Sequence, residues 1–205
     1  MRGISKEEAV ELLEPYIYKI KASVLNPIND YFTNPALTLH RQKLSKRSDA
    51  SNCHDLIVDQ IKMEFEQHPR TRLLHKNKVF FLIVEERVLL RFKLFDHKNL
   101  GRSINTIQST KLNNQEIEQL ELENMPPDGL LHVGYCINTL RTGVDNICVT
   151  YRQGDQNLWE WDLLEGGSNN VKQIEIFPHE QPMDRKRKPR PKTDNVGEIV
   201  NGNNH

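Results

Sequence analysis

The chain has 205 residues, a length most often found as one domain and sufficient to bury a core. Its 28 Lys and Arg balance 28 Asp and Glu, 37% of its residues are hydrophobic and its mean hydropathy is -0.66, which is typical of a polar globular protein. No run approaches the roughly 18 apolar residues of a membrane helix, and the first ten residues lack the apolar stretch of a signal peptide. We therefore expect a cytoplasmic protein.

The N-terminal residues predict a helix. Ser5 and Glu8 have the spacing of a capping box. Apolar residues then recur three and four positions apart, which indicates one buried stripe that packs in the core rather than in a dimeric coiled coil. Pro15 interrupts the stripe, so we expect a kink or two short helices. The stripe consists of Val10, Leu13, Ile17, Ile20 and Val24.

A second helix is predicted over residues 53–67, with Ser51 as its N-cap and Pro69 after its end. The triplet Cys53, His54 and Asp55 contains groups used in nucleophilic catalysis. Adjacent helical residues point in different directions, so the three cannot form a triad among themselves. We interpret them as the start of the helix.

Two basic clusters precede the first predicted strand, and from residue 40 to 78 nine Lys or Arg stand against five Asp or Glu. Such clusters attract phosphate, which favours nucleic-acid binding or a metal-independent ribonuclease. A solvated surface without function is the simpler alternative. The candidate residues are Arg41, Lys43, Lys46, Arg47, Arg70, Arg72, His75 and Lys78.

Residues 79–84 and 88–95 predict a β-hairpin. In the second strand Arg91 and Lys93 alternate with apolar neighbours, which indicates a half-exposed strand. A metal-dependent nuclease commonly needs carboxylates on a strand with a lysine two residues on. Arg91 stands where the acid would be, which argues against that class.

Between the hairpin and the next strands, we expect a strand or irregular segment over residues 102–112 and an acidic helix over 113–123. Residues 130–163 then predict three strands joined by turns, a meander. Near its end, alternation places Trp159 and Trp161 on one face and Glu160 and Asp162 on the other. These two carboxylates are candidate contacts for a basic protein partner.

Cysteine and histidine spacing gives no support to a metal site. The cysteines at 53, 136 and 148 form no CxxC pair, and none of the eight histidines belongs to an HExxH motif. We therefore expect no metal and no cofactor. No complete catalytic motif is present either, which favours a protein that is not an enzyme.

The composition changes after residue 177. Residues 178–205 include DRKRKPRPK and offer little apolar surface, so they predict a disordered basic tail. Residues 1–177 predict a single α+β domain, with a helical part over 5–67 and a sheet part over 79–177 that ends in an edge strand at 171–177. We expect the N-terminal helices to pack on a mainly antiparallel sheet of about five strands, a hairpin plus a meander.

Five short segments occur in the order FKLFD (92–96), NTIQS (105–109), GYCIN (134–138), ICVTY (147–151) and NLWEWDL (157–163). In this order they resemble uncharacterised bacterial proteins that are encoded beside helix-turn-helix proteins of the ImmA/IrrE peptidase type. The resemblance implies an interaction protein of a toxin–antitoxin or phage-defence module, an effector neutralised by a cognate partner protein. It carries over no site residue.

Overall fold

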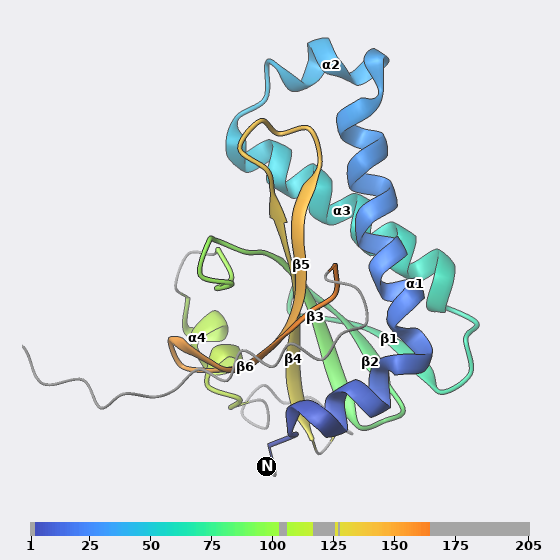
Figure 1. Ribbon diagram of the computed structural model, residues 1–205, viewed down its shortest axis with the longest axis vertical. Coiled ribbons are helices and arrows are strands. Elements are labelled where there is room, and N and C mark those ends of the chain that lie inside the picture. The colour runs from blue at the N-terminus through green and yellow to red at the C-terminus, as the bar shows by residue number, and fades with distance from the viewer. Residues whose placement is uncertain (1–2, 103–105, 117–125, 127, 165–205) are drawn as a thin grey trace, which may run out of the picture. The chain divides into compact units, whose positions relative to one another are not determined.

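The computed structural model describes residues 3–102, 106–116, 126 and 128–164 (Figure 1). Three helices come first, and six strands follow with one short helix among them. This order is the α+β class that the sequence predicted. The elements are α1 (Lys6–Thr33), α2 (Pro35–Arg41), α3 (Lys46–Phe65), β1 (Thr71–Lys76), β2 (Val79–Val84), β3 (Val88–Leu94), α4 (Ile107–Asn113), β4 (Gly129–Ile137), β5 (Val144–Gln153) and β6 (Gln156–Asp162).

The six strands form one sheet in sequence order, β1 to β6. All neighbours are antiparallel except β3 and β4, which are parallel. The predicted hairpin is β2–β3, and the predicted meander is β4–β6. The expectation of about five strands was one short, because Thr71–Lys76 contains few apolar residues and was interpreted as a basic connection. It is β1, a half-buried edge strand that pairs with β2 along its whole length.

One face of the sheet is covered by α1 and α3, which lie together on it (Figure 1). Both helices direct one stripe of side chains toward the sheet. The α3 stripe recurs every four residues, so a single row faces inward. Its buried members are Asp49, Cys53, Ile57, Ile61 and Phe65.

The start of α1 confirms the capping box. The backbone N–H of Glu8 donates to the Ser5 hydroxyl at 3.2 Å, and the backbone N–H of Ser5 donates to the Glu8 carboxylate at 3.1 Å. Pro15 and Pro27 both lie inside one continuous helix. Figure 1 shows that the dark-blue N-terminal turns run at an angle to the rest of α1, the bend that an internal proline produces.

The predicted start of α3 was wrong. The N-cap is Ser45, whose hydroxyl accepts from the backbone N–H of Ser48 at 3.1 Å. Ser51 lies inside the helix and donates its hydroxyl to the Arg47 carbonyl at 3.1 Å. Cys53, His54 and Asp55 are therefore mid-helix residues rather than a helix start.

The other face of the sheet carries a smaller apolar cluster beneath α4. It consists of Phe81, Ile83, Leu89, Leu112 and Leu130. The helix α4 occupies most of 102–112, where a strand or irregular segment was expected, because Thr106 and Ser109 form a second capping box. The expected helix over 113–123 falls largely outside the described residues, and α4 ends at Asn113 where that helix should begin.

Several other predictions also fall outside the described part of the chain. They are the edge strand at 171–177, the basic tail at 178–205 and the end of the domain at 177. Within the described residues, no helix combines the length and apolar character needed to cross a bilayer.

Candidate functional site

The structure separates the eight predicted basic residues. In the first cluster, Arg41 is directed inward: its guanidinium donates to the carbonyl of Phe32 at 2.9 Å and to that of Arg141 at 3.2 Å. It also lies over the Phe32 ring, 4.3 Å from the centroid. Arg41 therefore holds the end of α1 against the turn after β4, and both of its terminal guanidinium nitrogens donate to backbone carbonyls of the protein.

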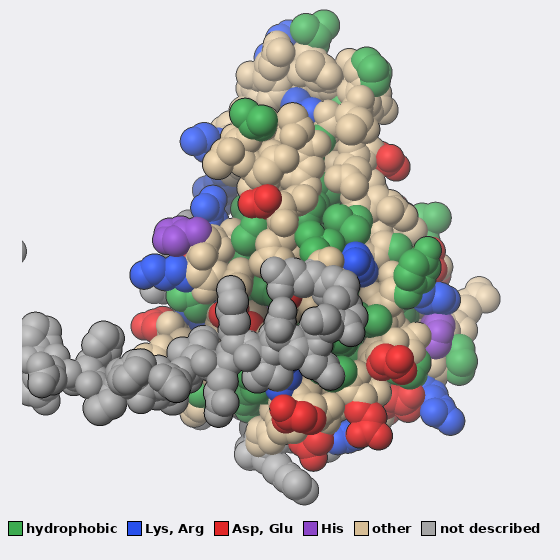
Figure 2. All heavy atoms as spheres, in the orientation of Figure 1, with side chains coloured by type: hydrophobic (Ala, Val, Ile, Leu, Met, Phe, Trp, Pro, Cys, Tyr) green, Lys and Arg blue, Asp and Glu red, His purple; other side chains and the backbone are tan. Residues whose placement is uncertain are grey.

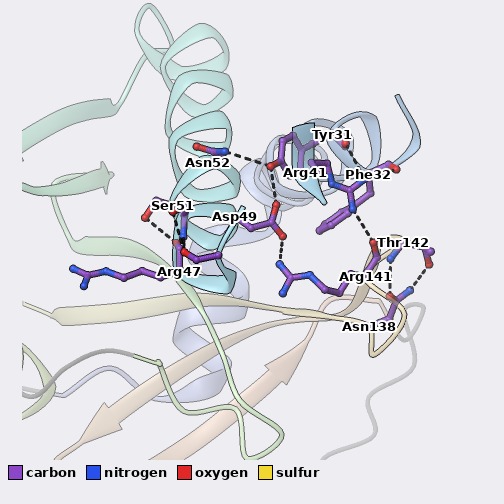
Figure 3. Close-up of polar contacts among 12 residues, drawn as sticks. Tyr31, Phe32, Arg41, Arg47, Asp49, Ser51, Asn52, Asn138, Arg141 and Thr142 are labelled. Carbon is purple, nitrogen blue, oxygen red and sulfur yellow. Dashed lines mark hydrogen bonds and ion pairs between the residues drawn. The ribbon is translucent and has the colours of Figure 1, made fainter. Parts of the chain in front are cut away.

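Next to Arg41, a polar network joins α1, α3 and the β4–β5 turn (Figure 3). Asp49 is buried and is paired with Arg141. The Tyr31 hydroxyl donates to Asp49 at 2.7 Å, and Asn52 donates to the Tyr31 hydroxyl at 3.3 Å. Figure 3 shows Arg47 extending from the other side of α3, away from this network.

In the second cluster, two arginines are paired with acids of the β2–β3 turn. Arg70 lies 3.5 Å from Glu85, and Arg72 makes a two-pronged contact with Glu86 at 3.1 and 3.0 Å. The hydrogen bonds with Arg72 lower the pKa of Glu86. These two arginines are largely neutralised, while His75 is exposed on β1.

A pocket of about 390 Å³ opens where β2 and β3 separate. The two strands pair only from Leu82–Val84 to Val88–Leu90, although β2 begins at Val79 and β3 continues to Leu94. The unpaired halves keep contact through Phe80 and Phe92, whose ring centroids lie 6.5 Å apart. The first turns of α3 line the same cavity. We call it the basic pocket.

The lining of the basic pocket is strongly cationic. Among the described residues that line it, five are Lys or Arg and one, Asp55, is a carboxylate. The cations come from α3, the β1–β2 turn, β3 and the loop after β3, so no single sequence cluster contains them. They are Arg47, Lys78, Arg91, Lys93 and Arg102.

These cations lie at two levels. Arg47, Lys78 and Arg102 are exposed, whereas Arg91 and Lys93 are half-buried on β3. Further exposed basic residues precede two of the exposed cations in the chain. Lys43 and Lys46 come shortly before Arg47, and His97 and Lys98 come shortly before Arg102. Figure 2 shows Lys, Arg and His side chains along the left edge of that view, beside the start of α3 and the loop after β3.

Burial changes the acid–base properties of the inner level. It lowers the pKa of Lys93 to about 7, with Arg91 and Arg152 adding to the effect. It also lowers the pKa of Arg91 to about 10, with Arg152 contributing. Shifted pKa values caused by burial and neighbouring like charges are found at many functional sites.

Two further groups belong to the lining. Burial lowers the pKa of His54, an effect that Asp55 opposes and that Arg91 and Lys93 reinforce. Tyr135 is 1% exposed and its hydroxyl has no hydrogen-bond partner among the described residues. Nη1 of Arg91 is likewise buried without a partner. Both of these atoms are buried beneath the surface of the cavity.

Of the eight predicted nucleic-acid residues, the structure brings only Arg47 and Lys78 to the basic pocket. Arg91, Lys93, Arg102 and His54 were not among the candidates. The available signal was the pair of cations at alternate positions of the otherwise apolar strand VLLRFKLF. Its alternation was interpreted as solvent exposure.

The predicted partner-binding carboxylates lie on the opposite side of β6 from the tryptophans, which pack against the main core. Glu160 accepts from the side chains of Asn99 at 2.6 Å and Asn157 at 2.8 Å. Asp162 accepts from the backbone N–H of Leu164 at 2.7 Å. Both therefore have roles within the fold, and their contact with a partner stays a prediction.

Among the described residues, no three His, Cys, Asp or Glu side chains are grouped in a way that could hold a metal ion. Comparisons of the chain with protein-family models, with curated proteins and with solved structures found no match.

Proposed function

We propose that the protein binds single-stranded nucleic acid through the basic pocket and its outer cations. One observation carries the proposal: five Lys or Arg residues from four separate segments are among the residues that line one cavity, together with a single carboxylate. A surface cavity lined mostly by residues of one charge sign attracts a ligand of the opposite sign. The exposed Lys and Arg side chains would contact successive phosphates of the bound strand.

The size of the cavity favours a single strand over a duplex. About 390 Å³ lies toward the small end of ligand pockets and accommodates one nucleotide unit, not the width of a double helix. A strand that follows the exposed cations would present one unit at a time to the opening between β2 and β3.

The test measures the affinity of fluorescently labelled single-stranded RNA and DNA by anisotropy over 50 to 200 mM salt. We expect affinity to fall as salt rises, because phosphate contacts release counterions. The double variant Arg47→Glu/Arg102→Glu should weaken binding at least tenfold.

The matched control is Arg70→Glu/Arg72→Glu, which changes the net charge by the same amount. These arginines are already paired with Glu85 and Glu86. Arg72 also lies about 13 Å along β1 from Lys76. Lys76 is at the end of the β1–β2 pair that is near the pocket, and Arg72 is at the far end. An equal loss of affinity in both double variants would show that binding depends on net charge, and the pocket would then not be the site.

The cellular role implied by the resemblance is also a proposal: an effector of a toxin–antitoxin or phage-defence module that acts on nucleic acid and is neutralised by a partner. Expression of the chain alone should arrest growth, and co-expression of the adjacent gene should relieve the arrest. Arrest that persists in Arg47→Glu/Arg102→Glu would separate this role from the basic pocket.

A further inference from the structure

One face of α3 forms a wall of the basic pocket. Side chains three and four residues apart along a helix lie on the same face. Arg47 is near the start of this face, and His54 follows two turns later, roughly 10 Å along the helix axis. The face consists of Arg47, Ala50, Ser51, His54 and Asp55. It therefore presents a cation and an imidazole to the same cavity.

The imidazole of His54 is suited to proton transfer. The side chain is half-buried in the lining, and it makes no hydrogen bond to any other described residue. Its ring nitrogens, unlike Nη1 of Arg91, are not shut off from the surface. Because its pKa is lowered, the unprotonated form that a general base requires is populated at lower pH than in an ordinary histidine.

Three exposed cations of the same lining, Arg47, Lys78 and Arg102, come from separate segments of the chain. Such cations hold the oxygens of a phosphodiester and stabilise the negative charge that develops when its phosphorus is attacked. The lining has two hydroxyls. Ser51 donates its proton to the Arg47 carbonyl at 3.1 Å, and Tyr135 is 1% exposed. A substrate that brings its own nucleophile therefore matches this lining best.

RNA is a substrate of this kind. Each of its internal phosphodiesters lies beside a 2′-hydroxyl, which DNA lacks. Once a base removes the proton of that hydroxyl, its oxygen can attack the adjacent phosphorus without any nucleophile from the protein.

We propose that the basic pocket cleaves single-stranded RNA, with His54 as the general base. The inference rests on the proposed function, because the strand must first bind in the pocket. His54 accepts the proton of a 2′-hydroxyl, whose oxygen forms a bond to the adjacent phosphorus. The bond from that phosphorus to the 5′ oxygen of the next nucleotide breaks, and this oxygen takes a proton from water. The hydroxide that remains takes the proton from His54. The products end in a 2′,3′-cyclic phosphate and a 5′-hydroxyl.

The experiment incubates the full chain with labelled single-stranded RNA in the presence of EDTA and follows the products by electrophoresis and mass spectrometry. We expect products with a 2′,3′-cyclic phosphate, and no cleavage of DNA of the same sequence. His54→Gln, which keeps a polar side chain, should slow cleavage at least a hundredfold while RNA affinity changes less than twofold. The matched control is His40→Gln, at an exposed histidine of α2, which should cleave at the unmodified rate.

The pH dependence of cleavage distinguishes a base from a structural residue. The rate should rise with pH as His54 loses its proton, at a pH below the ordinary histidine pKa of 6.5. Asp55 raises the pKa of His54, so Asp55→Asn should move this rise to lower pH. A rise that stays at the same pH in Asp55→Asn would overturn the assignment of His54 as the base.

The remaining outcomes separate the inference from the proposed function. RNA that binds the unmodified protein and stays intact would overturn the inference and leave nucleic-acid binding standing. Neither binding nor cleavage would overturn both proposals. Equal cleavage of DNA would exclude the 2′-hydroxyl as the nucleophile, and an unchanged rate in His54→Gln would exclude His54 as the base.

Discussion

Arg91 of β3 and His132 of β4 are direct partners in the parallel register of the sheet. His132 is paired in turn with Thr150 of β5, so the three side chains form one row across the face that α4 partly covers. His132 is 2% exposed, and neither of its ring nitrogens has a hydrogen-bond partner among the described residues. Burial, reinforced by Arg91, Lys93 and Arg152, lowers its pKa well below the usual value.

Because His132 is buried and its pKa is lowered in the folded protein, we expect the protein to lose stability in acid. The unfolded chain protonates His132 below a pH of about 6.5, whereas the folded protein keeps it neutral. The unfolded state then binds more protons, so the free energy of unfolding should decrease as the pH falls from 7 to 5. Urea unfolding at several pH values measures this slope. His132→Leu should reduce it, and His97→Gln, at an exposed position, should not.

Ligand binding should depend on pH through Lys93. Its pKa of about 7 means that it loses its charge as the pH rises from 6 to 8. Affinity for an oligonucleotide with hydroxyl ends, whose phosphodiester charge is constant over this range, should therefore fall several-fold. Lys93→Arg should bind with little pH dependence, because a guanidinium stays protonated. A titration curve that is the same for both proteins would remove Lys93 from the site.

Arg91→Met should make the ligand-free protein more stable while it weakens binding of nucleic acid. The substitution keeps an extended apolar side chain and removes a buried donor without a partner, which we expect to stabilise the fold by about 1 kcal/mol. Thermal unfolding without ligand measures the change. A lower melting temperature would indicate that Arg91 has a structural rather than a ligand-binding role.

The sequence predicted elements whose signals are local. The Ser5 capping box and the period of the strands in 130–163 depend on neighbouring residues, and both are present in the structure. The β1 strand was missed because its burial comes from pairing with β2, not from an apolar pattern of its own. Ser51 was a reasonable N-cap by residue type, but Ser45 begins the helix six residues earlier.

The basic pocket was predictable only in part, because it depends on where β2 and β3 stop pairing. That register is set by contacts across the sheet. The point where the pairing of β2 and β3 ends therefore cannot be inferred from the segment VLLRFKLF alone. Charge clusters along the chain were also incomplete guides. Arg41 is engaged by a carbonyl 100 residues away, and Arg72 by Glu86 across the hairpin, so neither presents an unused charge. Lys78 and Arg47 reach the pocket from different elements.

Asp49→Ala should destabilise the protein, because it removes the acceptor shared by Arg141 and Tyr31. Loss of one member of a buried pair leaves the other without compensation. The Arg141 side chain is 34% exposed, so water can replace part of the contact, and we expect a loss of about 2 kcal/mol. Arg72→Ala, which breaks an exposed pair, should cost about 0.5 kcal/mol. Chemical denaturation of the two variants measures both values.

Gly134→Ala should destabilise the sheet where β4 pairs with the end of β3. Gly134 stands opposite Lys93 in the register, and an added methyl would overlap the ring of Phe95, which is buried over it. Such overpacking typically costs about 1 to 3 kcal/mol because neither the central strand nor the ring can shift without disturbing its neighbours. Phe95→Leu should reduce stability when it is the only substitution. Added to Gly134→Ala, it should instead restore part of the stability that Gly134→Ala removes. Additive losses in the double variant would show that the ring and the glycine are not in direct contact.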